Sequence, residues 1–156
     1  MAGKKKKPQN DGTIRNKRAR FDYELGDSYV VGVVLNGRET KSLRLGHGQL
    51  QGSYVTVKDN ELWLLNAQIH GSSGIPLSDT ESIQTRKLLA KRKQIDQIIA
   101  AKQQGNTIVP TDILTRGRYI KVRIAIGKGK REYDKRHTMK QRDDKRNTQR
   151  ELRRHQ

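Results

Sequence analysis

The positive charge of this chain lies at its two ends, and this distribution confines a hydrophobic core to the segment between them. Residues 1–20 carry 8 Lys and Arg against 1 acidic residue, residues 21–115 carry 10 against 10, and residues 116–156 carry 16 against 5. The net charge of +18 therefore belongs to the ends. The body, residues 21–127, is long enough for one compact domain, and we expect no second one.

Cations gathered in this way favour a polyanionic partner, because each Lys or Arg placed on a phosphate releases condensed counterions. Nucleic acid is therefore the first partner to consider. The chain has no cysteine, which excludes disulfide bonds and thiolate metal sites and is typical of a reducing compartment. Its longest apolar run, residues 30–35, is far shorter than a membrane span. We expect a soluble, cytoplasmic protein that does not use a membrane.

The two ends are too poor in apolar side chains to fold on their own. Residues 1–15 combine a lysine run with Pro, Gly and Asn, so we predict a disordered basic arm. Residues 130–156 hold 11 basic and 5 acidic residues and consist mostly of good helix formers. Because isolated helices are marginal, we predict a basic C-terminal tail that is disordered in solution and helical when bound. A tail that serves only solubility is the alternative.

The first half of the body has the pattern of β-strands. Residues 29–35 are a β-branched run, and the two-residue turn Asp59-Asn60 joins residues 54–58 to residues 61–69. The segment 38–45 is ambiguous. Asn36-Gly37 in front of it is typical of a tight hairpin, which would make this segment a further strand.

The second half of the body predicts one long helix followed by two strands. Ser78 and Glu81 have the spacing of a capping box, and Gly105 is placed to end the helix. The apolar stripe between them consists of Leu88, Leu89, Ile95, Ile98 and Ile99. Residues 107–109 and 119–126 follow as strands, and the second of these alternates between an apolar and a basic face.

Five strands with one long helix between the third and the fourth are the arrangement of a small OB-type β-barrel, a fold that commonly binds oligonucleotides. We therefore predict a mainly β domain with helices over residues 16–129. A hairpin at Asn36-Gly37 would raise the number of strands to six.

The sequence lacks the known catalytic and metal-binding patterns. Its four histidines stand at least 18 residues apart, which does not match zinc-ligand spacing. The segment 127–130 (GKGK) lacks the upstream Gly and the Ser or Thr of a nucleotide-binding loop, although its lysines suit an RNA phosphate. Ser42, His47 and Asp59 are no more than a chance triad. We expect no enzymatic activity, no metal and no cofactor.

Six short motifs occur in order along the chain. They are Asn16-Lys17-Arg18-Ala19, the segment 37–44 (GRETKSLR), Ser53-Tyr54-Val55, the segments 63–67 (WLLNA) and 85–89 (TRKLL), and Gly129-Lys130 followed by 133–136 (YDKR). Each motif is weak alone. Together and in this order they closely resemble the SmpB family, the SsrA-binding proteins of bacteria, from about residue 16 to residue 150.

The resemblance implies an OB-type domain that binds the tRNA-like domain of transfer-messenger RNA (SsrA) and delivers it to the vacant A site of stalled ribosomes in trans-translation. It also implies a tail that occupies the decoding site and the empty mRNA channel. We expect the free protein to be a monomer. The implied RNA-binding residues are Asn16, Lys17, Arg18, Glu39, Lys41, Ser42, Arg44, Arg86, Lys87, Leu89, Lys128 and Lys130. The implied ribosome-binding residues of the tail are Tyr133, Asp134, Lys135, Arg136, Lys140, Arg142, Lys145 and Arg146.

The resemblance further implies a short helix at Gly37 in place of a hairpin, and it leaves Glu39 to orient a nearby cation or to accept a hydrogen bond from a base. Three departures from the family pattern stand out. Val30-Val31 replaces Glu-Ala, the segment 82–84 (SIQ) replaces Asp-Pro-x-Arg, and His47-Gly48 replaces Lys-Ala. The first affects one RNA contact of the family, and the second affects the start of the predicted long helix.

Two other functions compete with the RNA adaptor. A ribosomal structural protein is the alternative, because such proteins also join a small body to basic tails. An RNA-processing enzyme is a third, and no metal or nucleophile pattern supports it.

Overall fold

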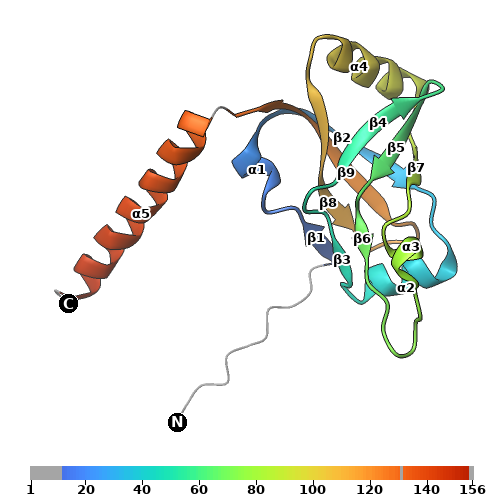
Figure 1. Cartoon of the computed structure of the whole chain (residues 1–156), viewed down its shortest axis with the longest axis horizontal. Coiled ribbons are helices and arrows are strands. Elements are labelled where there is room, and N and C mark those ends of the chain that lie inside the picture. The colour runs from blue at the N-terminus through green and yellow to red at the C-terminus, as the bar shows by residue number, and fades with distance from the viewer. Residues whose placement is uncertain (1–11, 131, 155–156) are drawn as a thin grey trace.

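The computed structural model describes residues 12–130 and 132–154 of the chain. Figure 1 shows a body of strands and short helices from which the long helix α5 (Glu132–Arg154) projects. Residues 1–11 of the predicted arm lie outside the described residues. The last three residues of that arm form strand β1 (Thr13–Arg15), so the predicted disorder is wrong for them. Ile14 packs against the core, which offsets the entropy lost on ordering.

Six strands of the body form a closed ring of hydrogen-bonded neighbours. They are β2 (Tyr23–Val33), β4 (Tyr54–Lys58), β5 (Glu61–Leu65), β7 (Arg86–Leu89), β8 (Thr107–Leu114) and β9 (Lys121–Gly129). The sheet runs in the order β1-β8-β4-β5-β7-β2-β9, and β9 also pairs with β8. This last pairing closes the sheet, so each ring strand has an inner and an outer face. Strands β3 (Gly48–Gln49) and β6 (Gln68–Ile69) form a separate small sheet.

The single long helix predicted after Ser78 is wrong. The capping box of Ser78 and Glu81 is present, but its helix, α3 (Asp79–Ser82), has only 4 residues. Leu88 and Leu89 lie in β7, which pairs with β5 on one side and β2 on the other. Helix α4 (Arg92–Gln103) begins only after that strand. Pairing with two neighbouring strands therefore overrides the helical spacing of the leucines.

The insertion of β7 also changes the order of the elements. Four ring strands precede α4 and two follow it, so the predicted place of the long helix between the third and the fourth strand is wrong. The ring has six strands, although the sixth is not the segment 38–45 that the sequence leaves open.

Asn36-Gly37 begins a helix, α2 (Gly37–Arg44). The Asn36 side chain accepts a hydrogen bond from the Glu39 backbone N–H at 2.8 Å, and the Glu39 carboxylate accepts one from the Asn36 backbone N–H at 3.2 Å. This capping box satisfies N–H groups that a helix start leaves unpaired. The hairpin alternative is wrong, and the short helix that the family resemblance implies is confirmed.

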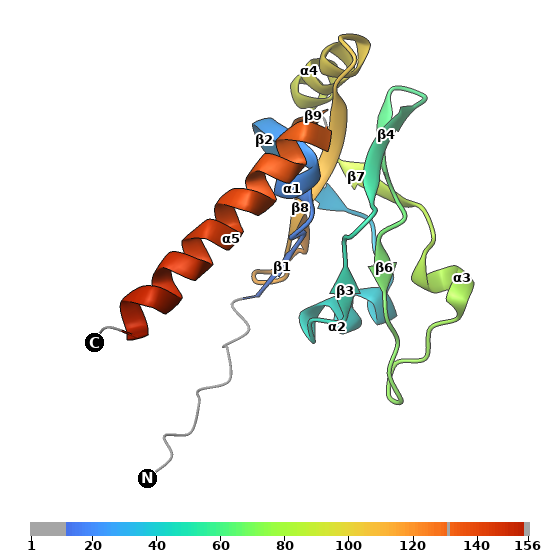
Figure 2. The same ribbon diagram turned by 60° about the vertical axis from the view of Figure 1, so that its left-hand side comes forward.

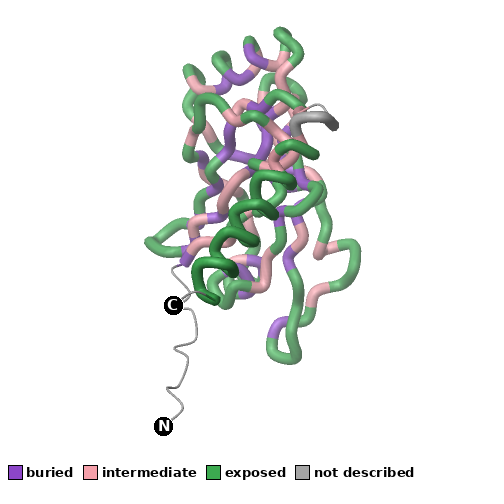
Figure 3. The backbone as a smooth tube through the Cα atoms, turned by 90° about the vertical axis from the view of Figure 1, so that its left-hand side faces the viewer, coloured by how far each residue is buried: buried purple, intermediate pink, exposed green. Residues whose placement is uncertain are grey.

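The hydrophobic core fills the ring and continues beneath α4. Its fully buried side chains include Leu62, Ile98, Ile108 and Ile124. Figure 3 shows the buried segments concentrated within the body. The predicted alternation of the last strand is confirmed from Ile120 to Ile124, because Val122 and Ile124 are buried while Lys121 and Arg123 are exposed. It is wrong at Ala125, which is buried instead of facing outward. The basic face of β9 therefore points outward.

The tail is a continuous helix, α5, in the structure of the chain alone, whereas the sequence predicts disorder in the unbound state. Residues 139–154 are all exposed, so the helix buries no apolar stripe along most of its length. Its helix-forming composition and contacts at its base support it. No helix in the described part of the chain is both long and apolar enough to cross a membrane.

Candidate RNA-binding surface

The outer face of β9 and the short helix α1 (Ala19–Asp22) border a basic depression, which we call the α1 cleft. It consists of two adjacent hollows that are both lined by Arg20, Thr111, Asp112 and Arg123. The larger hollow, of about 480 Å³, extends to Lys130. The other extends to Arg15 and Lys17. The cleft thus collects cations from β1, α1, β9 and the residues that join them.

A carboxylate holds Arg123 in this cleft. Its Nη1 lies 3.1 Å from Asp112 Oδ2, which also accepts a hydrogen bond from Thr111 Oγ1 at 3.0 Å. The Arg123 side chain nevertheless stays 44% exposed, so much of it remains accessible. Guanidinium groups bind phosphate oxygens through several N–H donors at once. The α1 cleft is therefore suited to the phosphates of an RNA backbone.

Asn16 fixes the chain at the edge of the α1 cleft. Its Nδ2 donates to the carbonyls of Pro110 at 2.9 Å and Leu50 at 3.3 Å, and its side chain is half-buried. The next two residues, Lys17 and Arg18, are exposed. Asn16 therefore positions these two cations instead of projecting into solvent itself.

Strand β7 divides the predicted motif TRKLL between the two faces of the ring. Arg86 and Leu88 are buried, whereas Lys87 is half-buried and Leu89 is 54% exposed. Lys87 Nζ lies 2.8 Å from Glu61 Oε2 on the outer face of β5. Thr85, Lys87 and Leu89 of this motif are therefore accessible to a partner, whereas Arg86 and Leu88 are not.

Arg86 lies inside the protein and uses its donors there. Its Nε donates to Glu39 Oε2. Its Nη1 and Nη2 donate at 3.0–3.2 Å to the carbonyls of Ala67, Gln84, Glu81 and Ser82. Five acceptors match the five N–H groups of a guanidinium. Arg86 thereby joins β7 to α2, α3 and the residues around them.

Burial corrects the expected direct RNA contacts of three residues. Glu39 is 2% exposed, Ser42 0% and Arg86 3%, so these side chains have almost no surface to offer to RNA. Glu39 and Arg86 instead satisfy each other's charge. The sequence motif that contains them contributes to the interior of the body.

Arg44 is exposed, but its guanidinium is engaged with the protein. Nη1 donates to the carbonyls of Thr115 at 2.9 Å and Gly117 at 3.1 Å, and Nη2 donates to that of Arg118 at 3.2 Å. Arg44 thus fastens α2 to the connection between β8 and β9. Lys41 on the same helix is exposed and lines a separate hollow near Pro76.

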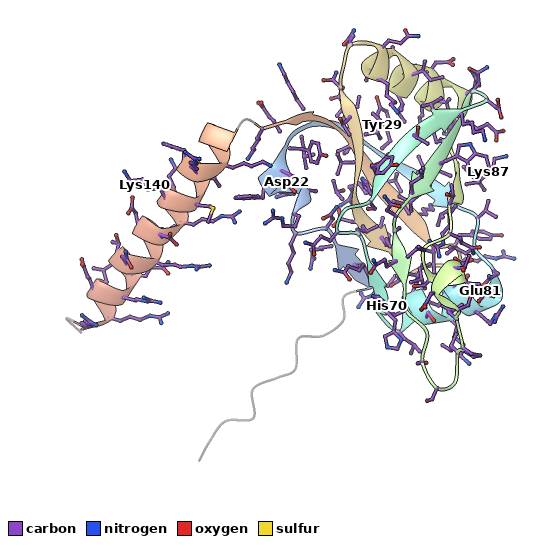
Figure 4. The ribbon with its side chains drawn as sticks, in the orientation of Figure 1. Asp22, Tyr29, His70, Glu81, Lys87 and Lys140 are labelled. Atoms are coloured by element: carbon purple, nitrogen blue, oxygen red, sulfur yellow. The ribbon has the colours of Figure 1, made fainter. Side chains whose placement is uncertain are left out.

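The remaining predicted body residues lie at the end of β9. Lys128 is exposed and lies opposite Glu24 of β2, and Lys130 lines the α1 cleft. Lys87, by contrast, lies on the side of the body away from α5 (Figure 4). The structure therefore places Lys130 in one hollow of the α1 cleft and Lys17 in the other. Lys41, Lys87, Leu89 and Lys128 line neither hollow.

The tail meets the body at α1. Lys135 Nζ lies 3.3 Å from Asp22 Oδ1, and the Arg142 guanidinium carbon lies 5.9 Å from the centre of the Phe21 ring. Arg18 contacts the same two residues, at 3.6 Å from Asp22 and 4.8 Å from the Phe21 ring centre. Figure 2 shows α5 running alongside α1, and Figure 4 shows Asp22 on the side of the body that faces α5.

Most of the predicted ribosome-binding residues of the tail are exposed, including Arg142 at the junction itself. The exposed predicted residues are Arg136, Lys140, Arg142, Lys145 and Arg146. The side chains of Tyr133 and Asp134 lie outside the described ones. Figure 4 shows Lys140 well away from the body.

Three cations of the α1 cleft, Arg15, Arg20 and Arg123, are missing from the residues that the family motifs imply. The outward alternation of β9 contains the signal for Arg123. The carboxylate that holds Arg123, Asp112, lies 11 residues earlier on another strand. The sequence does not reveal this ion pair, because it depends on the register of β8 with β9. Among the described residues, no group of three or more His, Asp or Glu is placed to hold a metal ion.

A closed, mainly β body with a basic outer cleft and a long cationic helix has the organisation of a small nucleic-acid-binding protein. The model of the SmpB protein family matches residues 13–154, and the chain belongs to this family. The match includes both the body and α5.

Individual relatives support the same assignment. The SsrA-binding protein of Saccharophagus degradans is 44% identical over 149 residues, which cover 91% of each chain. That of Thermobifida fusca is 41% identical over 158 residues, which cover 99% of each chain. A chain in a solved structure described as "tmRNA-SmpB: a journey to the center of the bacterial ribosome" is 32% identical, with a TM-score of 0.65 over 78% of this chain and 86% of that one.

Proposed function

We propose that this protein binds the tRNA-like domain of transfer-messenger RNA and delivers it to the vacant A site of stalled ribosomes. The family match that runs from β1 through α5 is the observation that carries this proposal. The matched residues include both the body with its basic cleft and the cationic helix α5. The protein thereby acts as an adaptor in the cytoplasm and catalyses no reaction itself.

The body is the part that holds the RNA. In this proposal the closed ring is an OB-type barrel, which offers its outer strands and loops to oligonucleotides. Lys17, Arg20, Arg123 and Lys130 of the α1 cleft contact backbone phosphates, which supply affinity and fix the orientation of the RNA. Leu89 adds an exposed apolar contact on the outer face.

In this proposal the tail is the part that binds the ribosome. Helix α5 has 23 residues and is therefore about 34 Å long. Its exposed Lys and Arg side chains suit a channel lined with RNA phosphates, so in this proposal the helix occupies the decoding site and the empty mRNA channel. Contacts of this kind do not depend on a messenger sequence, as rescue of any stalled ribosome requires.

A truncated chain that ends at Lys130 separates the two roles. It keeps the cleft residues, so we expect it to bind the tRNA-like domain with nearly the affinity of the full chain. It lacks α5, so we expect no tagging of stalled peptides in a translation reaction programmed with a messenger that lacks a stop codon. Full tagging by the truncated chain would exclude the proposed role of the tail.

Co-purification with ribosomes separates the adaptor from the ribosomal structural protein. An adaptor is enriched on stalled ribosomes, together with one dominant transfer-messenger RNA. Stoichiometric presence on all ribosomes, without that RNA, would contradict the adaptor function.

A further inference from the structure

The connection between β8 and β9 carries an exposed aromatic side chain that no role described so far uses. We infer that Tyr119 is a stacking platform for an unpaired base of the bound RNA, and that Arg44 holds the loop that presents it. This inference rests on the proposed function for the identity of the RNA. It adds a base contact to a surface that otherwise contacts phosphates.

Arg44 gives the loop a defined shape. Its guanidinium donates hydrogen bonds to three carbonyls of the loop, those of Thr115, Gly117 and Arg118. Gly117 adopts a φ of 90°, a conformation that side-chain-bearing residues rarely adopt. At the start of the loop, the Thr115 backbone N–H donates to the Gly12 carbonyl at 2.7 Å. The loop is therefore anchored to α2 and to the chain before β1, so the position of Tyr119 is set in advance of binding.

Tyr119 is 68% exposed, the highest value among the large apolar side chains of the described residues. Its neighbour Ile120 is 5% exposed and supplies the core contact at this end of β9. The ring of Tyr119 therefore contributes little to folding. The Arg118 guanidinium carbon lies 5.5 Å from its centre, a cation–π contact that leaves most of the ring accessible to a second planar group.

The surroundings of Tyr119 identify the occupant as nucleic acid. Lys121 and Arg123 lie on the outward face of β9 and are exposed, and Tyr119 is exposed in the bend just before this strand. The exposed cations of β9 therefore lead from the loop toward the α1 cleft. Residues 107–129 contain five Lys and Arg and only one acidic residue, Asp112. Lys121 lies opposite Gly32, which has no side chain to cover it. An aromatic ring at the end of a basic track is the arrangement that binds single-stranded segments.

The test measures the affinity of the full-length protein for a transcript of the tRNA-like domain at several salt concentrations. We expect Tyr119→Ala to weaken binding roughly 5- to 150-fold, the range of one lost base–aromatic stack. The slope of log affinity against log salt should stay unchanged, because no phosphate contact is lost. Tyr119→Phe should bind as the wild type does, since stacking does not need the hydroxyl.

Two matched variants make the result specific. Tyr54→Ala removes another exposed ring, 40% exposed on β4, and should leave the affinity unchanged. Arg123→Ala removes a phosphate contact and should lower the salt slope by about 0.7 to 0.9. Equal affinities of the wild type and Tyr119→Ala would overturn the stacking platform. A failure of the wild type to bind the tRNA-like domain would overturn the proposed function instead.

Arg44→Ala tests the anchoring role. We expect it to weaken binding to about the extent of Tyr119→Ala, and the double variant to bind no more weakly than the worse single variant, because both changes remove the same contact. The salt slope should again be unchanged. A slope lowered by about 0.7 to 0.9, or additive losses in the double variant, would show that Arg44 contacts a phosphate and would overturn its role as the loop anchor.

Discussion

Arg86 is a charged side chain inside a closed sheet, and its position follows from the two-residue period of a strand. It shares the inward face of β7 with Leu88, and it lies opposite Leu64 of β5. An ionised group is tolerated in such a place only when its charge is paired and its donors are satisfied. Glu39 and four backbone carbonyls meet both conditions.

Removal of this guanidinium should be among the most destabilising substitutions in the body. Arg86→Ala leaves the Glu39 carboxylate buried without its partner, so we expect the free energy of unfolding to fall by about 3–5 kcal/mol in urea titrations. Lys87→Ala, on the outer face of the same strand, should change it by no more than about 0.5 kcal/mol.

A compensated variant tests the cause of this loss. Arg86→Met combined with Glu39→Leu leaves no unpaired charge and should recover the part of the stability that the unpaired carboxylate costs. The hydrogen bonds of Arg86 to four carbonyls and of Glu39 to the Asn36 N–H stay lost, so the recovery should be partial. Similar values for Arg86→Ala and Lys87→Ala would show that the buried ion pair contributes little.

At the scale of elements, local signals predict some structures well and miss those that tertiary pairing decides. The turn at Asp59-Asn60 is confirmed, because both residues take the positive φ values, 52° and 59°, that a two-residue hairpin turn needs. The alternation of β9 is confirmed as far as Ile124 for the same local reason. Both features are encoded within a few consecutive residues.

The sequence does not predict strand β7, because its four residues lack the alternation of apolar and polar side chains that is typical of a strand. It has only 4 residues, and one of its two inward positions holds Arg86 in place of an apolar side chain. The strand therefore shows no alternation, and its leucines combine with the isoleucines of α4 into an apparent helical stripe. The pairing with β2 and β5 that makes it a strand joins residues far apart in the chain.

The start of α2 depends on one side chain, which gives a prediction for this element. Asn36→Ala removes the acceptor for the Glu39 backbone N–H, so we expect a loss of about 0.5–2 kcal/mol in the free energy of unfolding. Asn36→Ser or Asn36→Asp retains a capping oxygen and should recover most of it. Equal stability of the Ala and Ser variants, measured by thermal denaturation, would contradict the capping role.

At the scale of the whole molecule, the described body and tail meet at α1, through Asp22 and Phe21. The pair of Asp22 with Lys135 is partly exposed, with side-chain exposures of 28% and 34%, and such pairs contribute at most about 1 kcal/mol. This ion pair by itself therefore contributes little to the direction of α5.

Asp22→Asn should loosen this junction without affecting the fold. The chain has no cysteine, so Ser73→Cys and Thr148→Cys provide two unique labelling sites, one on the body and one on α5. We expect Asp22→Asn to broaden the distribution of distances between two labels at these sites, because Lys135 loses its charged partner.

Asp96→Asn is the matched control for this measurement. It breaks the exposed pair with Arg92 on α4, far from α1, and should leave the distribution as it is in the wild type. Equal distributions for Asp22→Asn and the wild type would show that the ion pair does not orient the tail.

The short strand β1 has a consequence for self-association. Strand β4 pairs with β8 at Ile108, and β1 pairs with the far end of β8 at Ile113 and Leu114, so the two strands divide one edge of β8 between them. Unpaired strand edges recruit strands from other molecules, and aggregation begins there. By occupying the end of β8, three residues of the N-terminal segment cover an edge that would otherwise be open to pairing with a strand of another molecule.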